Sequence, residues 1–342
     1  MKTTAENGSP RRRATVRDIA RAAGVSPGAA SVALNGGTSR IGVSAATRKR
    51  VREAAARLGY RLNAAARATS TGRYGAAGMV FGSNPVDSYV GAGRLDALLR
   101  AFGAAGMNLS LSCLDDAFLT DENAVAGALS RLYADGLLVA YNSRVPRAFP
   151  RLLEKLRVPA VWINTKRPAC AVYPDDRAGT EALARRFLAE GRTDLVFAAD
   201  PGRSHYSFAD RRAGFEAAAR AAGIRPQVVV ARLDRRTGVA SAEPYRALFA
   251  DPRRRPAVLV YATGPILDAV LAAARAAGRR HGRDWFLATF AEKPLDVDGA
   301  PAAVAQVDER AFAAAVLDVF RRVTADPATP VPSVAIPYDV RP

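Results

Sequence analysis

The chain has 342 residues, which is more than one compact domain usually holds, so we expect at least two domains. Hydrophobic residues make up 49% of it, but no apolar run approaches the ~18 residues that a membrane span requires. The formal net charge of +18 is concentrated at one end, because residues 1–73 contain fifteen Lys and Arg against three acidic residues. A basic module of this kind indicates contact with nucleic-acid phosphates.

The rare residue types argue against several kinds of site. Cys113 and Cys170 lack the spacing of a metal or redox motif, and the chain contains only two histidines. We therefore expect two free thiols, no metal site and no cofactor. The first residues contain no apolar signal core, which predicts a cytoplasmic protein that is not secreted.

The N-terminal segment predicts a basic tail followed by two short helices. Residues 1–13 are polar and contain three consecutive arginines, which is typical of a disordered tail. Over Thr15–Asn35, apolar residues recur at helical spacing on both sides of Gly24, whose freedom at positive φ permits a sharp turn. Ser26 and Pro27 follow in the favoured order of N-cap and first helical residue. This segment alone fits an ordinary helical hairpin as well as a DNA-binding helix-turn-helix.

A third predicted helix distinguishes between these interpretations. Ser44 can cap it, Val51 and Leu58 belong to its apolar stripe, and Gly59 ends it. Three short helices in a basic N-terminal segment favour a DNA-binding headpiece over residues 14–60.

The sequence TVRDIARAAGVS, followed by ASVALN and VSAATRKRVREAAARLGYRLNAAARA, resembles the headpiece and hinge of the LacI/GalR family of bacterial transcription regulators. The resemblance implies a hinge helix and linker over residues 61–74 that orders on the operator, pairs with the same segment of a second protomer and enters the minor groove. It also implies a set of DNA-binding residues: Thr15, Ser26, Pro27, Gly28, Ala29, Ser31, Val32, Asn35, Asn63, Ala64, Arg67 and Thr69.

Two parts of this set depart from the family pattern. Pro27, Gly28 and Val32 occupy positions that the family uses for base edges, and none of them has a polar side chain. We therefore expect few direct hydrogen bonds to bases, with more discrimination from thymine methyl groups or DNA shape. In the hinge, Thr69 stands where the family usually has Leu, and Leu62 stands where it commonly has Pro. Because Thr69 is shorter than Leu and polar, it is a poor apolar wedge, so we do not expect a strongly kinked DNA complex.

From residue 75 onward, apolar strand segments alternate with helical segments, which predicts parallel sheets with helices on both faces. The expected strands cover residues 75–82, 107–114, 136–141, 159–164, 194–200, 227–233, 257–262 and 285–290. The expected helices lie near 91–105, 122–134, 149–156, 176–190, 209–222, 241–250 and 265–277, with a last one near 308–324.

The resemblance to the LacI/GalR family extends to this region and completes the expected fold class. It implies an N-terminal all-α helix-turn-helix headpiece plus an α/β periplasmic-binding-protein-like core of two parallel-sheet lobes. In that family the chain crosses between the lobes three times, and we expect these crossings near residues 174, 301 and 328. Lobe one would comprise about 75–174 plus 302–328, and lobe two about 175–301 plus 329–342.

The resemblance also places a small-molecule effector in the cleft between the lobes. Tyr89 follows the first strand, where the family often has an aromatic residue that stacks on the effector. Ser207 and Arg211 lie in SHYSFADRRAGF, which resembles the family's effector loop. Two acidic residues that the family commonly uses are replaced by Gly264 and Ala291. Arg211 would then make the cleft more positive and favour an anionic effector, such as a phosphorylated sugar or a carboxylate.

The sequence offers little support for catalysis. The adjacent acids Asp175 and Asp176 suggest either paired carboxylates or a helix N-terminus, and the second interpretation is favoured because neighbouring side chains diverge. No nucleophile has an adjacent base, and no phosphate-binding glycine loop occurs. We therefore expect a protein that is not an enzyme.

The resulting hypothesis is a sequence-specific DNA-binding transcriptional regulator, which we expect to act as a repressor. It would bind a palindromic double-stranded DNA operator as a homodimer, with an affinity that the effector modulates. Its expected location is the bacterial cytoplasm, in association with the nucleoid and without a membrane partner. The alternative is a ligand- or partner-sensing protein whose DNA-binding module is weakened.

Overall fold

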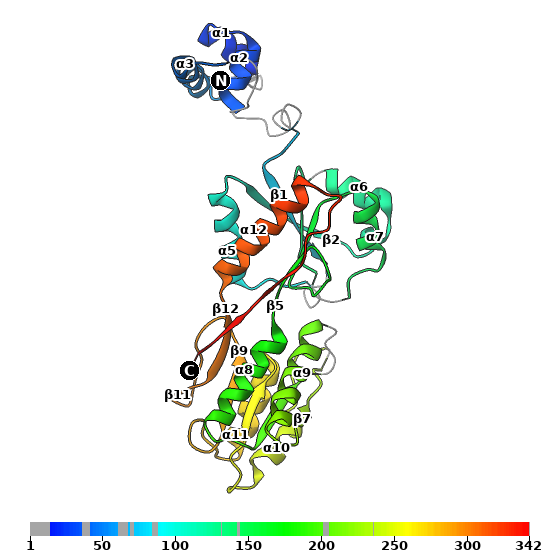
Figure 1. Ribbon diagram of the computed structural model, residues 1–342, viewed down its shortest axis with the longest axis vertical. Helices are drawn as coiled ribbons and strands as arrows, with labels where there is room; N and C mark the ends of the chain where they lie inside the picture. Colours follow the sequence, from blue (N-terminus) through cyan, green and yellow to red (C-terminus); the bar gives the residue numbers. More distant parts are fainter. Residues whose placement is uncertain are drawn as a thin grey trace, which may run out of the picture. The chain divides into compact units, whose positions relative to one another are not determined.

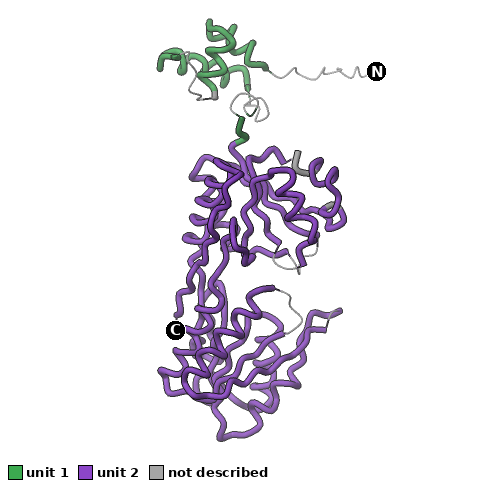
Figure 2. The backbone as a smooth tube through the Cα atoms, turned by 45° about the vertical axis from the view of Figure 1, so that its right-hand side comes forward, with its two compact units in different colours: residues 1–74 green, residues 75–342 purple. Residues whose placement is uncertain are grey.

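The computed structural model describes residues 14–35, 42–60, 68, 72–83, 88–130, 132–141, 144–200, 205–234 and 236–341. The predicted hinge residues Asn63, Ala64, Arg67 and Thr69, and the predicted N-terminal tail, lie outside these residues. The chain divides into two compact units, residues 1–74 and residues 75–342, and each has its own architecture (Figure 2). None of the described helices is both long and apolar enough to cross a membrane.

The first unit contains three helices, α1 (Val16–Ala23), α2 (Pro27–Asn35) and α3 (Ala45–Arg57) (Figure 1). Small residues dominate its core, so that the helices can pack closely: Ile19, Ala20, Ala23, Ala30, Ala33, Val51, Ala54 and Ala55 are buried. Leu58, predicted to belong to the apolar stripe, is instead 41% exposed. The reason is that α3 ends at Arg57, so Leu58 occupies the C-cap and leaves the inner face.

Lobe one of the second unit is built on a six-stranded sheet in the order β13-β5-β4-β3-β1-β2, with every neighbouring pair parallel. Helices α5 and α12 cover one face, where the rings of Phe102 and Phe320 pack edge to face at 5.4 Å. Helices α6 and α7 cover the other. The elements are β1 (Ala76–Gly82), α5 (Ala92–Ala104), β2 (Asn108–Leu114), the short 3-10 helix η1 (Phe118–Thr120), α6 (Glu122–Ser130), β3 (Gly136–Val139), α7 (Ala148–Lys155), β4 (Ala160–Ile163), β5 (Ala171–Pro174), α12 (Glu309–Ala325) and β13 (Val334–Ile336).

Lobe two repeats this arrangement with a sheet in the order β14-β12-β9-β8-β6-β7, in which only β14 is antiparallel to its neighbour. Helices α8 and α9 cover one face, and α10 and α11 cover the other. Strands β10 and β11 form a separate ribbon. The elements are α8 (Asp176–Ala189), β6 (Leu195–Ala199), α9 (Tyr206–Ala221), β7 (Gln227–Val230), α10 (Glu243–Ala250), β8 (Ala257–Val260), α11 (Pro265–Ala276), β9 (Phe286–Phe290), β10 (Asp296–Val297), β11 (Ala300–Pro301), β12 (Ala303–Val307) and β14 (Tyr338–Arg341).

The chain crosses between the lobes at Asp175, Asp308 and Pro337, the residues that join elements of different sheets. The second and third crossings lie later than the predicted positions near 301 and 328, which were therefore wrong. Strand β12 pairs with β9 in lobe two before the chain leaves that lobe. Strand β13 pairs with β5 in lobe one before the chain returns to lobe two. These short strands show no resolvable hydrophobic alternation, so the sequence pattern did not reveal them.

Candidate DNA-binding headpiece and inter-lobe site

Two predicted DNA-binding hydroxyls lie at helix starts of the headpiece. Thr15 Oγ1 accepts from the backbone N–H of Asp18 at 3.3 Å, while the Thr15 N–H donates to Asp18 Oδ2 at 2.9 Å, forming a capping box. Ser26 Oγ accepts from the backbone N–H of Ala29 at 3.1 Å. Both hydroxyls therefore stabilise the helices in addition to any contact with DNA.

The turn between α1 and α2 depends on one glycine. Gly24 adopts a left-handed conformation with φ of 61°, and the following N–H of Val25 donates to the carbonyl of Ala20 at 3.0 Å. A side chain at this position would be strained, although space is available for it. The glycine therefore fixes the direction in which α2 leaves the turn.

The predicted DNA-binding residues around α2 lie outside the headpiece core. Ala30 and Ala33 are buried in the headpiece core, while the remaining predicted residues of this stretch are exposed or half-exposed: Ser26, Pro27, Gly28, Ala29, Ser31 and Val32. Asn35 is the last helical residue. Four of these six accessible residues have no polar side chain, so the expectation of few direct hydrogen bonds to bases stays a prediction.

Basic side chains outside the predicted set are also exposed on the headpiece. They lie on α1 and α3: Arg17, Arg21, Arg48, Lys49, Arg50 and Arg52. Such side chains provide the sequence-independent attraction to DNA phosphates. The Arg-Lys-Arg run at 48–50 was the sequence signal that marks them.

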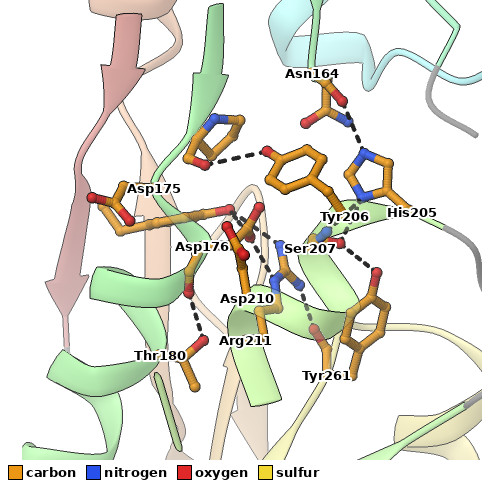
Figure 3. Close-up of polar contacts among 12 residues, drawn as sticks. Asn164, Asp175, Asp176, Thr180, His205, Tyr206, Ser207, Asp210, Arg211 and Tyr261 are labelled. Atoms are coloured by element: carbon orange, nitrogen blue, oxygen red, sulfur yellow. Dashed lines mark hydrogen bonds and ion pairs between the residues drawn. The ribbon is translucent and has the colours of Figure 1, made fainter. Parts of the chain in front are cut away.

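In lobe two, Arg211 on α9 lies within a closed polar cluster (Figure 3). Its Nε donates to Oδ1 of Asp176 at 2.6 Å, and its Nη2 donates to the Tyr338 hydroxyl at 3.1 Å. Its Nη1 donates to the backbone carbonyl of Tyr261, and the guanidinium lies 3.6 Å from the ring centre of Phe290. The side chains of Arg211 and Asp176 are 11% and 1% exposed.

The electrostatics of this cluster correct the expectation of an uncompensated Arg211. Burial by itself would lower the pKa of Arg211, but the Asp176 carboxylate and the nearby tyrosine hydroxyls raise it overall. For Tyr338, burial raises the pKa, so its hydroxyl stays protonated and donates a hydrogen bond to Asp176 at 2.9 Å. The charge of Arg211 is thus balanced within lobe two, which removes the argument for an anionic effector.

Ser207 belongs to a hydrogen-bond chain that links the two lobes (Figure 3). Its Oγ lies 2.6 Å from the Tyr261 hydroxyl and 2.6 Å from Nδ1 of His205, the N-cap of α9. The other ring nitrogen of His205, Nε2, lies 2.8 Å from the backbone carbonyl oxygen of Asn164. Asn164 follows β4 in lobe one, so His205 bridges the lobes.

The geometry fixes the tautomer of His205. The backbone N–H of Ser207 points at Nδ1 at 3.3 Å, and a backbone N–H can only donate. Nδ1 is therefore the acceptor, and Nε2 carries the hydrogen that it donates to the carbonyl of Asn164. His205 was not among the predicted site residues, because a single histidine before a helix has no distinctive sequence signal.

Other polar contacts join the lobes around the same helix start. Lys166 Nζ pairs with Asp210 at 2.6 Å, and the Tyr206 hydroxyl donates to the carbonyl of Pro174 at 3.2 Å. At the start of α5, a Cβ added to Gly91 would overlap a carboxylate oxygen of Glu292, so this acidic side chain from lobe two reaches lobe one. Glu292 directly follows Ala291, so lobe two keeps one carboxylate beside one of the two positions that lack the family acids.

Three further positions were singled out from the sequence: Tyr89, the remaining predicted effector residue, and Gly264 and Ala291, where the family commonly has acidic residues. Tyr89 precedes α5 and is 64% exposed. Gly264 is the N-cap of α11, with φ of 104°, and Ala291 follows β9. In the described part of the chain, no group of His, Cys, Asp and Glu side chains could hold a metal ion.

The comparisons with known proteins agree with this architecture. Residues 15–63 match the family model of bacterial regulatory proteins of the lacI family. The sucrose operon repressor of Klebsiella pneumoniae is 30% identical over 270 residues, which cover 76% of this chain and 77% of that protein. The chain belongs to the LacI family.

Solved structures share the fold of this LacI-family protein. A lac repressor dimer bound to operator and an anti-inducer has a TM-score of 0.72 at 20% identity, covering 97% of this chain and 98% of that one. A complex of the transcriptional regulator CelR with cellobiose has a TM-score of 0.58 at 19% identity, covering 96% and 99%. The fold class predicted from the sequence is confirmed, and the protein is a DNA-binding transcription regulator.

Proposed function

We propose that this LacI-family protein is a transcriptional repressor that binds a palindromic operator as a homodimer and responds to a neutral sugar. The observation that carries the proposal is the intact headpiece, with its capping box, its Gly24 turn and the accessible face of α2, in the same chain as a two-lobe core. This intact packing disfavours the alternative of a weakened DNA-binding module. The related repressors named for the sucrose and lac operons support the same function.

The effector class follows from the charges around Arg211. Asp176 compensates the guanidinium and Lys166 compensates Asp210, while Glu292 adds a carboxylate where lobe two meets the start of α5 in lobe one. A neutral polyol can both donate to carboxylates and accept from guanidinium or hydroxyl groups, whereas an anion would be repelled by the carboxylates. Of the solved relatives, one is described as a cellobiose complex. A neutral sugar therefore fits better than the anion suggested by the sequence.

Exposed apolar side chains support a homodimer. They lie on or beside the edge strands of the two lobes: Leu99 and Leu111 in lobe one, and Val230 and Val239 in lobe two. Apolar side chains along an edge strand are commonly covered by a partner. A two-fold dimer would also present two headpieces to the two halves of a palindrome.

The test is a binding measurement with the full chain. Fluorescence anisotropy and footprinting on the DNA upstream of its own gene should show a protected palindrome, and sucrose, cellobiose or another neutral sugar should change the affinity. If only phosphorylated sugars change it, the neutral-sugar assignment is wrong. Absence of any protected site would contradict the repressor function itself. Sedimentation should give a dimer, and the double substitution L111D/V230D should shift it to a monomer.

A further inference from the structure

Four loops of lobe two lie at the N-terminal ends of its parallel strands. They precede β9, β8, β6 and β7, which follow one another in this order across the sheet. The residues that contact lobe one come from the opposite ends of these strands, since His205 follows β6 and Asp210 lies on the helix after it. The N-terminal ends of these strands therefore lie at the opposite side of the sheet from the inter-lobe site.

Two arginines join these loops into one connected surface. Arg254 donates to both carboxylate oxygens of Asp194, at 2.6 and 2.8 Å, and to Oε1 of Gln227 at 2.6 Å. It thereby connects the loops before β8, β6 and β7. Arg279 is 8% exposed and donates to the carbonyl oxygens of Asp251 at 3.1 Å and Asp284 at 2.9 Å, and also to that of Arg254. It connects the loops before β8 and β9.

Four further arginines lie on the same loops but do not join one loop to another. They are exposed and have no ion-pair partner among the described residues: Arg225 before β7, Arg253 and Arg255 before β8, and Arg280 before β9. By contrast, Arg283 in the same region pairs with Asp284 at 3.0 Å. The connected loops therefore carry a row of guanidinium groups that have no ion-pair partner among the described residues. This row lies at the N-terminal ends of the parallel strands.

We propose that this arginine edge, consisting of Arg225, Arg253, Arg255 and Arg280, is a second binding surface for the phosphate backbone of double-stranded DNA. Guanidinium groups bind phosphate oxygens through two parallel hydrogen bonds and remain charged at every physiological pH. Phosphate contacts of this type do not depend on base sequence. The surface is separate from the headpiece and goes beyond operator recognition.

The arrangement of the arginines favours a linear polyanion over a small anion. Neighbouring strands lie about 4.8 Å apart, so the row from the β9 loop to the β7 loop extends over roughly 14 Å. A row of this length can face several phosphates of one DNA strand, whereas a single phosphate would engage one or two of its groups. With the headpieces on one duplex, the arginine edge would hold a second DNA segment and bring two segments together.

The experiment measures capture of a second duplex by the full-length protein. The protein is bound to a bead-immobilised duplex, unbound protein is washed away, and a fluorescent duplex of unrelated sequence is added over a range of salt concentrations. The test variant is R253E/R255E/R280E. The matched control is R151E/R310E/R321E, which changes the net charge equally at exposed arginines of α7 and α12 in lobe one. The milder R253Q/R255Q/R280Q is tested as well, and Arg254 and Arg279 are left in place.

Wild type and the matched control should capture the second duplex, and the test variant should lose capture at least about tenfold. The plot of log affinity against log salt for this capture should flatten by about 2.7 in the test variant, for three lost phosphate contacts. The glutamine variant should show a smaller loss in the same direction. Binding to the first duplex should stay unchanged in all proteins, because it reports on the headpiece and on the proposed repressor function.

Two results would overturn the proposal. One is equal capture by wild type and test variant, or an equal loss in the matched control, because the arginine edge would then make no specific contribution. The other is binding of polyglutamate or of anionic phospholipid vesicles that depends on the three arginines while duplex capture does not. That outcome would assign the surface to an acidic protein or to a membrane.

Discussion

The caps that start the headpiece helices and the polar cluster around Arg211 rest on contacts of very different range along the chain. In the headpiece, Thr15 contacts Asp18 and Ser26 contacts Ala29, each three residues away. In the inter-lobe site, Arg211 contacts residues 35, 50 and 127 positions away, namely Asp176, Tyr261 and Tyr338. A change at one of these caps should therefore affect one helix start, whereas a change at Arg211 should loosen several elements of lobe two at once.

The largest effect should come from removing the partner of Arg211. Asp176→Asn leaves a buried guanidinium without its counter-ion, so we expect the free energy of unfolding of the core to fall by about 3–5 kcal/mol. Urea unfolding followed by tryptophan fluorescence measures this, because both tryptophans, Trp162 and Trp285, lie in the core. The control is Glu243→Gln, which breaks the exposed pair with Arg246 and should cost less than ~1 kcal/mol. Equal effects of the two substitutions would contradict the role assigned to Asp176.

A core substitution in the headpiece should lower the stability of that unit by a similar free energy, but it should abolish DNA binding and leave the core unaffected. Ile19 is fully buried in a small core, so Ile19→Ala should cost about 2–5 kcal/mol, enough to unfold this module. DNA binding should be lost, while the unfolding transition of the core and its thermal shift with sugar stay as in wild type. Loss of the sugar response in Ile19→Ala would show that the two units are not independent.

The His205 bridge between the lobes should contribute less, because Lys166–Asp210 and Tyr206–Pro174 also join the lobes. His205→Ala removes both the N-cap of α9 and the donor to the Asn164 carbonyl, which should cost about 1–3 kcal/mol. His205→Asn serves as the matched variant, since asparagine caps helices well but is too short for the ring's contact with Asn164. Fluorescence transfer between dyes on the two lobes should show a wider spread of distances in both variants. An unchanged distribution would contradict the bridge.

The smallest effect should appear as a pH dependence of stability. Burial lowers the pKa of His281 below its ordinary value of 6.5, so below that pH the unfolded chain binds more protons at this residue than the folded one. Stability should therefore fall as the pH decreases below 6.5, by at most about 1.4 kcal/mol per pH unit from this group. Urea unfolding at pH 7.5, 6.0 and 5.0 should show a weaker decline in His281→Gln. An identical decline would assign the effect to other groups.

Several features of this protein could be predicted from residues close together in sequence. The helix starts at Ser26 and Ser44 and the turn at Gly24 were visible, because capping and positive φ depend on a few neighbouring residues. The alternation of strands and helices after residue 75 was visible for the same reason, since the apolar periodicity of each element is local. This information predicted parallel sheets with helices on both faces and a DNA-binding headpiece, whereas the two-lobe arrangement was implied by the resemblance to the LacI/GalR family.

The tertiary structure decided the features that depend on distant residues. The crossings at Asp308 and Pro337 became apparent only when β12 and β13 found their partner strands. The charge balance of Arg211 was likewise set by Asp176 and Tyr338, and no sequence pattern connects these residues with Arg211. Charge balance in a buried site depends on which groups lie within a few ångströms of each other, and folding brings those groups together from separate parts of the chain.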